Sequence, residues 1–344
     1  MLCPLDKNEK PYDLPESVKK LFLETARDIP FNRYPDPDHG ELREKLSSYC
    51  GFPAERIVLG NGGDELLWMI FTKYVGPRDV VLAFSPTFSE YHRLAGLFKA
   101  DLQLIPADLD GDEPVFDYDS FIRAASETSP SLVLLDTPNN PTGLTHPASF
   151  IGKVVSLAEP TILVDEAYGE FARSTWLDSM KGEDLPKNVA VLKTMSKAWG
   201  LAGLRFGYAV CGERTASELS DVRAPFNVNS LTAAAAEIAL EHRSLLFEGV
   251  RGITRLRDNF IQEVNSLDGW RAFLSDGNFV LIRAPVAWDR MASFLEGISL
   301  KRIFHPLHEA ESRCLVRVSV GNGQEMDFVS QALLRIQKEV GCHD

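Results

Sequence analysis

The sequence has no long hydrophobic run and no excess of positive charge. No apolar stretch approaches the roughly 20 residues that a membrane helix needs. The first residues, MLCPLDKNEKPYD, are polar and include acids, which is unlike a signal or transit peptide. The net charge of −13 and the pI near 5.1 repel nucleic acids and anionic membranes on average. We therefore expect a cytoplasmic protein that has neither nucleic acid nor membrane as a partner.

Cysteine and histidine show none of the spacings of redox or metal sites. The seven histidines contain no H-E-x-x-H or similar pattern, so we expect no metal site built from protein side chains. No C-x-x-C pair occurs either. In a chain without an export signal, reduced thiols, several of them buried, are expected at Cys3, Cys50, Cys211, Cys314 and Cys342.

Repeats and low-complexity tracts are also absent, and the length of 344 residues suggests about two domains. From about residue 57 to 212, short apolar runs alternate with segments of helical spacing. This alternation predicts an α/β domain with a mainly parallel seven-stranded sheet covered by helices on both faces. The predicted strands are 57–59, 80–84, 102–105, 132–136, 161–165, 189–192 and 206–211.

The pattern changes from Leu231 onwards. Two long helical patterns run to about residue 264, followed by strand candidates at 279–284 and 315–320 and by helices near 288–295 and over 325–340. The first 30 residues show little periodicity and are expected to form an arm. We thus predict an N-terminal arm (1–30) that packs with the small domain, a large domain (31–235) and a small C-terminal α+β domain (236–344).

The segment TMSKAWGLAGLRFGY holds the most informative residues, among them Lys197. A lone Ser-Lys dipeptide usually belongs to the surface. Upstream, however, TILVDEAYGEF places Asp165 at the end of an apolar strand, and DTPNNPTG follows another such strand. Ligands of open α/β sheets bind at the carboxyl ends of the strands, where these polar groups are expected to meet.

These residue types fit the parts of a phosphorylated pyridine aldehyde. A lysine amine forms an imine with the aldehyde, and a carboxylate keeps the ring nitrogen protonated, so that the ring accepts electrons. A tyrosine hydroxyl and an asparagine amide can hydrogen-bond the ring's phenolate oxygen. The fork of an arginine suits a phosphate dianion.

The motifs resemble those of the fold-type I pyridoxal-phosphate-dependent aminotransferases of class I/II, and within them the histidinol-phosphate aminotransferase branch. The resemblance extends over nearly the whole chain. Further similar segments are LDKNEKPYD (N-E-N-P-Y-G in the branch), FNRYPDPDHGELREKL (Y-P-D-P), GNGGDELL (G-N-G-S-D-E), PTFSEY (P-T-Y-x-x-Y) and RVSVGN (R-I-T-V-G). The implied cofactor is pyridoxal 5'-phosphate.

The resemblance implies a role for each matching residue of the catalytic centre. Lys197 is the Schiff-base lysine and also moves the proton between the substrate's α-carbon and the cofactor. Asp165 pairs with the ring nitrogen, while Asn140 and Tyr168 contact the phenolate oxygen. Asn140 also borders the substrate.

The cofactor's ring and phosphate have matching residues as well. Phe88 corresponds to the aromatic side chain that stacks on the ring, and Tyr91 is expected to pack in the pocket wall. A helix begins after the strand 57–59, so its backbone N–H groups can face the phosphate. The implied phosphate cup consists of Gly62, Gly63, Asp64, Thr194, Ser196 and Arg205.

The substrate and the second subunit involve residues outside these loops. Arg317 matches the arginine that holds the substrate's carboxylate, and Tyr12 in the arm borders the substrate side chain. Tyr34, in the loop NRYPDPDHG, matches a tyrosine that reaches the phosphate of the neighbouring subunit's cofactor. The resemblance therefore implies a homodimer with shared active sites.

The substrate side departs from the branch's pattern at several positions. The arm has Lys10 and Asp13 where asparagine and glycine are usual, which bears on specificity. Phe88 replaces a commoner tyrosine. The G-I-x-V-R element reads GISLKR, so the residue near a substrate phosphate is either Lys301 or Arg302.

The expected activity is reversible transamination between a small-molecule amino donor and a 2-oxo acid, namely histidinol phosphate and 2-oxoglutarate in histidine biosynthesis. Aminotransferases for aromatic or other amino acids belong to the same branch and are the first alternative. A lyase such as a threonine-phosphate decarboxylase shares the scaffold. A transcription regulator would need a DNA-binding module, whereas the arm motif begins within the first ten residues, so we expect none.

Overall fold

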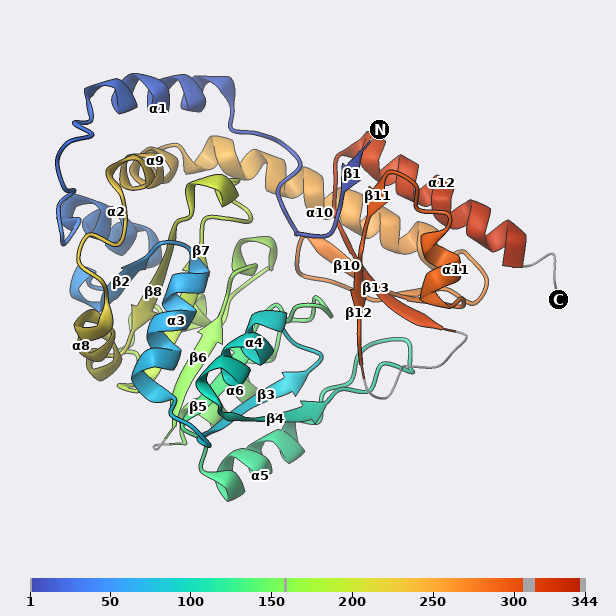
Figure 1. Cartoon of the computed structure of the whole chain (residues 1–344), viewed down its shortest axis with the longest axis horizontal. Helices are drawn as coiled ribbons and strands as arrows, with labels where there is room; N and C mark the ends of the chain where they lie inside the picture. The colour runs from blue at the N-terminus through green and yellow to red at the C-terminus, as the bar shows by residue number, and fades with distance from the viewer. Residues whose placement is uncertain (1, 158–159, 306–312, 341–344) are drawn as a thin grey trace.

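The computed structural model describes residues 2–157, 160–305 and 313–340 (Figure 1). Its largest sheet has seven strands in the order β2-β8-β7-β6-β5-β3-β4, and all seven predicted strands are confirmed. Six of these strands share one direction, and β8 runs in the opposite direction. The strands are β2 (Ile57–Gly60), β3 (Val80–Ser85), β4 (Asp101–Pro106), β5 (Leu132–Asp136), β6 (Thr161–Asp165), β7 (Val189–Thr194) and β8 (Gly207–Cys211).

Helices cover both faces of this sheet, which explains why its central strands are apolar throughout. In β5, Val133 and Leu135 pack into the hydrophobic core on one face, and Leu132 and Leu134 into the core on the other. The first face carries α2 (Gly40–Cys50), α5 (Tyr118–Thr128), α6 (Ala148–Val155), α7 (Trp176–Ser179) and α9 (Ser230–Glu241). The second carries α3 (Gly63–Tyr74), α4 (Ser89–Phe98) and α8 (Glu213–Val222).

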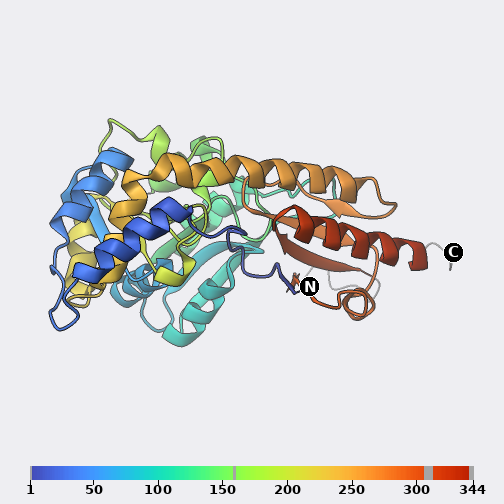
Figure 2. The ribbon, with the colours of Figure 1, turned by 90° about the horizontal axis from the view of Figure 1, so that it is seen from above.

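A second, antiparallel sheet forms the core of the C-terminal part. Its order is β12-β13-β10-β9, with α10 and α12 packed together beside it. The long helix α10 runs from α9 along both parts of the molecule (Figures 1 and 2). The elements are α10 (Arg243–Asn265), β9 (Arg271–Ala272), β10 (Phe279–Ala284), α11 (Trp288–Ala292), β12 (Lys301–Ile303), β13 (Cys314–Ser319) and α12 (Gly323–Val340).

The change from one core to the other lies within α10. Leu246 belongs to the core of the large sheet, and Val250 to the core of the C-terminal sheet. The boundary at residues 235 and 236 stays a prediction, and this packing favours a later division. The large domain also contains three short 3-10 helices: η1 (Ala54–Arg56), η2 (Gly169–Phe171) and η3 (Ala202–Leu204).

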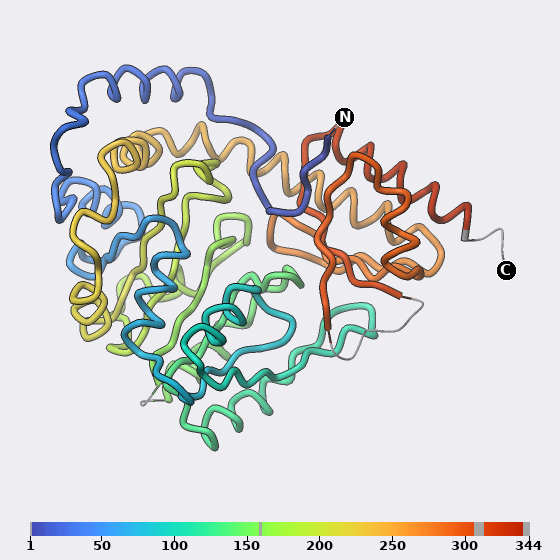
Figure 3. Tube along the Cα trace, viewed as in Figure 1, coloured from blue at the N-terminus to red at the C-terminus, as the bar shows by residue number. Residues whose placement is uncertain are grey.

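The first 30 residues hold more regular structure than the sequence predicts. The strand β1 (Cys3–Pro4) pairs in parallel with β11 (Ile298–Ser299) of the C-terminal part. The chain then crosses to the large domain, where α1 (Glu16–Asp28) packs on α9 (Figure 3). Val18, Leu21 and Phe22 have the i, i+3, i+4 spacing of a helical face, so the expectation of little periodicity was wrong for this segment. The arm thus connects both parts of the molecule.

No helix among the described residues is long and apolar enough to cross a membrane. The four cysteines in the described part of the chain are buried free thiols, as expected. Cys342 lies outside the described residues.

Candidate active site

The loops at one edge of the large sheet gather most of the predicted site residues. β3, β5, β6 and β7 are mutually parallel, and β2 has the same direction because two antiparallel pairings through β8 separate it from β7. The carboxyl ends of these five strands therefore meet at one edge. Asp165 ends β6, Asn140 follows β5, Lys197 follows β7, Phe88 follows β3, and the glycines of GNGGDE follow β2.

Asp165 is a buried carboxylate held by two donors. The Tyr91 hydroxyl donates to it at 2.9 Å, and the backbone N–H of Ala167 donates at 3.0 Å. Burial raises the pKa of Asp165 to about 6. Tyr91 is itself completely buried, and its hydroxyl gives it more than the packing role expected from the sequence.

Tyr168 lies between two asparagine amides. The Asn140 amide donates to its hydroxyl at 3.4 Å, and the amide of Asn8 in the arm donates at 3.0 Å. The backbone N–H of Asn140 is held by the buried carboxylate of Asp136 at 2.9 Å. Burial raises the pKa of Asp136 to about 7. The structure therefore brings Asn140 and Tyr168 together. It adds Asn8 and Asp136, which lie in the quoted segments LDKNEKPYD and DTPNNPTG but had no role assigned from the sequence.

Lys197 and the nearby Lys193 have opposite environments. Lys197 donates its amine to the backbone carbonyl of Lys7 at 2.9 Å, and the nitrogen lies 5.8 Å from the centre of the Tyr168 ring. Lys193 is buried between Glu166 at 3.4 Å and Glu170 at 3.2 Å. Burial favours the neutral amine, but the two carboxylates outweigh it and raise the pKa of Lys193. Lys193 therefore stays charged, whereas the amine of Lys197 contacts a backbone carbonyl and is partnered by neither of these carboxylates.

The predicted phosphate cup surrounds the start of α3. Gly62 precedes this helix with φ +84°, and no side chain caps the helix's first N–H groups. Arg205 donates to Asp64 at 2.8 Å and to the Ser196 hydroxyl at 3.4 Å, and the Thr194 hydroxyl donates to Ser196 at 3.0 Å. A Cβ atom at Gly62 would lie 2.6 Å from the Arg205 guanidinium. Glycine there permits both the backbone conformation and the close approach of Arg205.

An open cavity of about 940 Å³ lies in front of these loops and is bordered by the C-terminal sheet and the arm. All three parts of the chain contribute to its wall. Its lining includes Asp6, Lys7, Phe88, Asn140, Lys301 and Arg317. The half-buried ring of Phe88 thus faces an open volume, as a stacking aromatic must.

Arg317 is a buried cation in the wall of the cavity. Its guanidinium donates to the Asn140 side-chain oxygen and to the backbone carbonyl of Asp6, both at 2.5 Å. Its Nε atom is buried without a hydrogen-bond acceptor, and burial lowers the pKa of the guanidinium. A buried donor without an acceptor is unfavourable unless a ligand or water satisfies it. The group is therefore suited to bind an anion.

The two candidates for a second cation differ in orientation. Lys301 lies directly opposite Arg317 in the β12–β13 pairing, whereas Arg302 lies opposite Val316. Directly paired residues point to the same face of a sheet, and successive residues alternate. Both residues border the cavity, but only Lys301 shares the face of Arg317. Arg302 instead lies 4.5 Å from the ring centre of Phe304.

The arm residues that depart from the branch's pattern, Lys10 and Asp13, make their contacts away from the cavity. Lys10 donates to the backbone carbonyl of Leu246 at 2.8 Å, and burial lowers its pKa to about 8. Asp13 forms an exposed ion pair with Lys19 at 2.5 Å. Tyr12 is 45% exposed and does not line the cavity in the single chain. In the single chain, Lys10 therefore anchors the arm to α10, and neither Lys10, Tyr12 nor Asp13 lines the cavity.

Tyr34 is a predicted site residue that lies on the surface of the single chain. Its side chain is 81% exposed, and its ring stacks on that of Phe226 with centres 4.6 Å apart. Within one chain, Tyr34 is therefore a surface side chain, and its role in a site stays a prediction.

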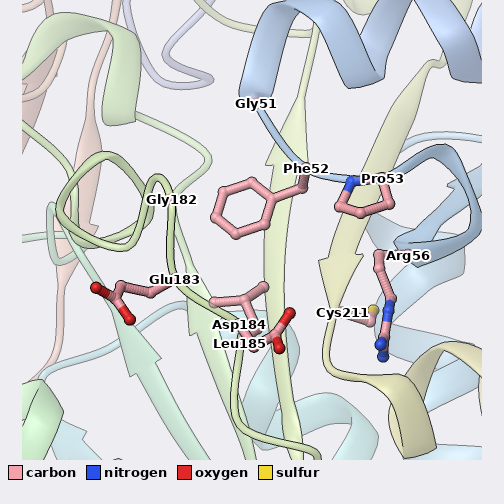
Figure 4. Close-up of a pocket in the computed structure, with 9 residues that line it drawn as sticks. All are labelled: Gly51, Phe52, Pro53, Arg56, Gly182, Glu183, Asp184, Leu185 and Cys211. Atoms are coloured by element: carbon pink, nitrogen blue, oxygen red, sulfur yellow. The ribbon is translucent and has the colours of Figure 1, made fainter.

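A second cavity of about 380 Å³ lies elsewhere, between the end of α2 and the loop 182–185 (Figure 4). Phe52 points into it, with Arg56 and the acidic side chains of Glu183 and Asp184 around it. Arg56 lies 3.8 Å from the Glu213 carboxylate. None of the predicted site residues lines this cavity, so it has no part in the site.

Comparison with known proteins identifies the family of the chain. The profile of the family Aminotransferase class I and II matches residues 2–327. The chain is 35% identical over 332 residues to the histidinol-phosphate aminotransferase of Thermoanaerobacter pseudethanolicus, covering 96% of this chain and 91% of that protein. It is 38% identical over 337 residues to that of Chlorobium phaeovibrioides, covering 96% and 90%. The crystal structure of the Sinorhizobium meliloti enzyme in complex with pyridoxal-5'-phosphate has the same fold, with a TM-score of 0.87 at 24% identity over 98% of this chain and 91% of that chain. The protein is an aminotransferase that belongs to the class I and II family and, within it, to the histidinol-phosphate aminotransferases.

Proposed function

We propose that the enzyme catalyses reversible transamination between histidinol phosphate and 2-oxoglutarate, with pyridoxal 5'-phosphate as its cofactor. One structural observation carries the substrate assignment. Two cationic side chains, Lys301 and Arg317, are directly paired on the neighbouring strands β12 and β13, and both border the cavity. A phosphate and a carboxylate are the anions of the two substrates. The relatives named above carry the same activity in their names.

The polar groups of the site fit the cofactor. A buried carboxylate, Asp165, suits the pyridine nitrogen, and the amide of Asn140 and the hydroxyl of Tyr168 suit the phenolate oxygen. The uncapped start of α3 beside Arg205 suits the phosphate dianion. When bound, the cofactor supplies an electron-accepting ring and an aldehyde that Lys197 holds covalently.

Two residues of the chain then act on protons at different atoms. Asp165 holds a proton at the ring nitrogen, and the Tyr91 hydroxyl helps to keep this carboxylate charged. The amine of Lys197 removes the proton from the substrate's α-carbon and returns it during the reverse reaction. The carbonyl of Lys7 is the present acceptor of this amine and keeps it directed toward the arm side of the site.

Arg317 serves both substrates in this proposal. Glutamate offers carboxylates, whereas histidinol phosphate has only a phosphate, so one guanidinium must accept either anion. Its contact with the Asp6 carbonyl is replaced when the anion arrives. Lys301, on the same face, adds a second positive charge that favours the phosphate.

The test is a spectroscopic screen of half-reactions. The purified enzyme with pyridoxal phosphate is mixed separately with glutamate, histidinol phosphate, phenylalanine and threonine phosphate, and conversion to pyridoxamine phosphate is followed. We expect fast conversion with glutamate and histidinol phosphate. Fast conversion with phenylalanine alone would make the enzyme an aromatic aminotransferase, and release of carbon dioxide from threonine phosphate would make it a lyase.

We also propose that the working unit is a homodimer with shared active sites. Exposed aromatic side chains of the N-terminal region support a covered surface: Phe31 is 80% exposed and Tyr34 is 81% exposed. Such exposure of neighbouring aromatics is typical of an interface. In the assembly, the Tyr34 hydroxyl supplies one more donor to the partner's cofactor phosphate.

Active-site complementation tests the shared site. Lys197→Ala and Tyr34→Ala homodimers are each expected to be weak, because each damages both sites. A mixed dimer contains one site built from intact parts and should recover up to about half of the wild-type activity per dimer. The shared-site proposal fails if mixing restores nothing after confirmed subunit exchange, or if a dilute monomer is fully active.

A further inference from the structure

Three consecutive residues of the arm contact three groups that the proposed function uses. The backbone carbonyl of Asp6 accepts from Arg317 at 2.5 Å, and that of Lys7 accepts from Lys197 at 2.9 Å. The third contact uses a side chain: the Asn8 amide donates to the Tyr168 hydroxyl at 3.0 Å. Any residue could supply the two carbonyls. Asn8 is therefore the position where the identity of the arm residue matters to the site.

Every polar group of Asn8 has a partner. Its N–H donates to the Ser319 hydroxyl oxygen at 2.8 Å, and its side-chain oxygen accepts from that hydroxyl at 2.8 Å. Its carbonyl accepts from the Asn278 amide at 3.0 Å. The residue is 1% exposed and has φ 55°, a left-handed conformation that asparagine tolerates better than most residues. Its amide nitrogen is thus fixed in the direction of Tyr168.

This arrangement determines where the hydroxyl of Tyr168 points. Its oxygen accepts N–H groups from Asn8 at 3.0 Å and from Asn140 at 3.4 Å. Amide N–H groups only donate, so the hydroxyl hydrogen must point away from both amides. It is then available to the phenolate oxygen of the cofactor.

We propose that Asn8 is a positioning residue, whose amide orients the Tyr168 hydroxyl toward the cofactor and ties this orientation to β13 through Ser319. Ser319 and Arg317 lie two residues apart and share a face of β13. One arm residue thus joins the anion-binding strand to the hydroxyl that tunes the cofactor. The inference rests on the proposed function, because it requires bound pyridoxal phosphate.

The test follows the pH midpoint of the visible absorption band of the holoenzyme. Asn8→Ala should move this midpoint in the same direction as Tyr168→Phe, by about half a pH unit, the effect of one weakened hydrogen bond. Asn8→Asp keeps the shape and the acceptor but loses the donor, so it should show the shift even if Asn8→Ala does not fold. Ser319→Ala, which only loosens the anchor, should shift the midpoint less.

A double-mutant cycle separates positioning from a general structural effect. In a Tyr168→Phe background, Asn8→Ala should add no further shift, because the hydroxyl that it orients is gone. Thr25→Ala, at an exposed neutral position of α1 in the same arm, is the matched control and should leave the midpoint unchanged.

Two results overturn the positioning role: a wild-type midpoint in Asn8→Ala and Asn8→Asp, or a shift that persists in the Tyr168→Phe background. A wild-type enzyme that gives no visible band with pyridoxal phosphate overturns the proposed function as well. A normal band that no Asn8 variant moves overturns the role of Asn8 alone.

Discussion

The two sides of the active-site cavity are built in different ways. The cofactor side consists of loops at the ends of adjacent strands of one sheet, and its carboxylates, Asp136 and Asp165, are buried and hydrogen-bonded by neighbours in those loops. The substrate side joins the two ends of the chain. There, Arg317 is held by the carbonyl of Asp6, a residue 311 positions away in the sequence.

This difference predicts a difference in function. The partners of Asp165 are part of the folded sheet and stay in place throughout the reaction. Arg317 is held by a backbone carbonyl that an anion can replace. Changes on the cofactor side should therefore impair the reaction of every substrate. On the substrate side, the effect should depend on which anions a residue binds, because Arg317 serves both substrates in the proposal and Lys301 mainly the phosphate.

The largest effect is expected for Lys197→Ala on the cofactor side. The variant should fold but lose the visible absorption of bound cofactor and all measurable turnover, because no other amine replaces the nucleophile. Borohydride treatment of the wild type should attach the cofactor to the peptide that contains Lys197. A label on Lys193 would contradict the assignment, since Lys193 is buried between Glu166 and Glu170.

Asp165→Asn should be the next most damaging change. An amide does not hold a proton on the ring nitrogen, so α-proton removal should slow by about 10³-fold, ~4 kcal/mol in the barrier. The loss should be equal for glutamate and histidinol phosphate, and the cofactor should still bind, because the phosphate cup is unchanged. Stopped-flow half-reactions measure both.

Tyr91→Phe is a milder change that affects the same carboxylate, Asp165. It removes one hydrogen bond to the Asp165 carboxylate and should slow both half-reactions by about tenfold or less. A near wild-type rate in Asp165→Asn, or a loss confined to one substrate, would show that the cofactor side does not act on all substrates alike.

The sequence predicts the cofactor side better than the substrate side for the same physical reason. Strand ends and loop motifs are local in sequence, so the amino-acid pattern alone places Asp165, Asn140 and Lys197 at one sheet edge. The pattern does not pair Asn8 with Tyr168, because that contact depends on how the arm returns to β13. Likewise, only the β12–β13 register distinguishes Lys301 from its neighbour.

The fold shows the same limit. All seven strands of the large sheet follow from apolar runs. Six of them are almost entirely buried, whereas the edge strand β4 is half-buried or exposed along its length. Helix α1 has helical spacing at Val18, Leu21 and Phe22, but only the structure shows that the helix packs on α9.

On the substrate side, Arg317→Ala should lower kcat/KM about 10²-fold for both substrates, because it removes a buried, charge-assisted anion contact. Lys301→Ala should lower kcat/KM about tenfold for histidinol phosphate and little for glutamate. Arg302→Ala is the matched control, one residue away on the opposite face. If Arg317→Ala damages only the glutamate reaction, the phosphate is bound elsewhere and the dual use is wrong.

The smallest expected effect concerns stability of the cofactor-free protein. Asp136 has a folded pKa of about 7, above the ordinary value of 3.8, because of burial. The folded state therefore binds this proton more tightly than the unfolded state. Its stabilising contribution is complete below about pH 4 and is lost as the pH rises through about 7. Asp136→Asn removes this titration and should flatten the fall in unfolding free energy between pH 4 and 8, measured by urea denaturation, by on the order of 1–3 kcal/mol.

Asp13 in the arm has a pKa shift of the opposite sign to that of Asp136. Its hydrogen bond from Lys19 lowers its pKa, so its contribution is present above the ordinary carboxyl pKa and is lost as the pH falls. Asp13→Asn should leave the slope between pH 5 and 8 unchanged, because both folded and unfolded states are already ionised there. A parallel pH slope in wild type and Asp136→Asn would show that this buried carboxyl has no raised pKa. Asp136 on the cofactor side would then lack the raised pKa that distinguishes it from Asp13 in the arm.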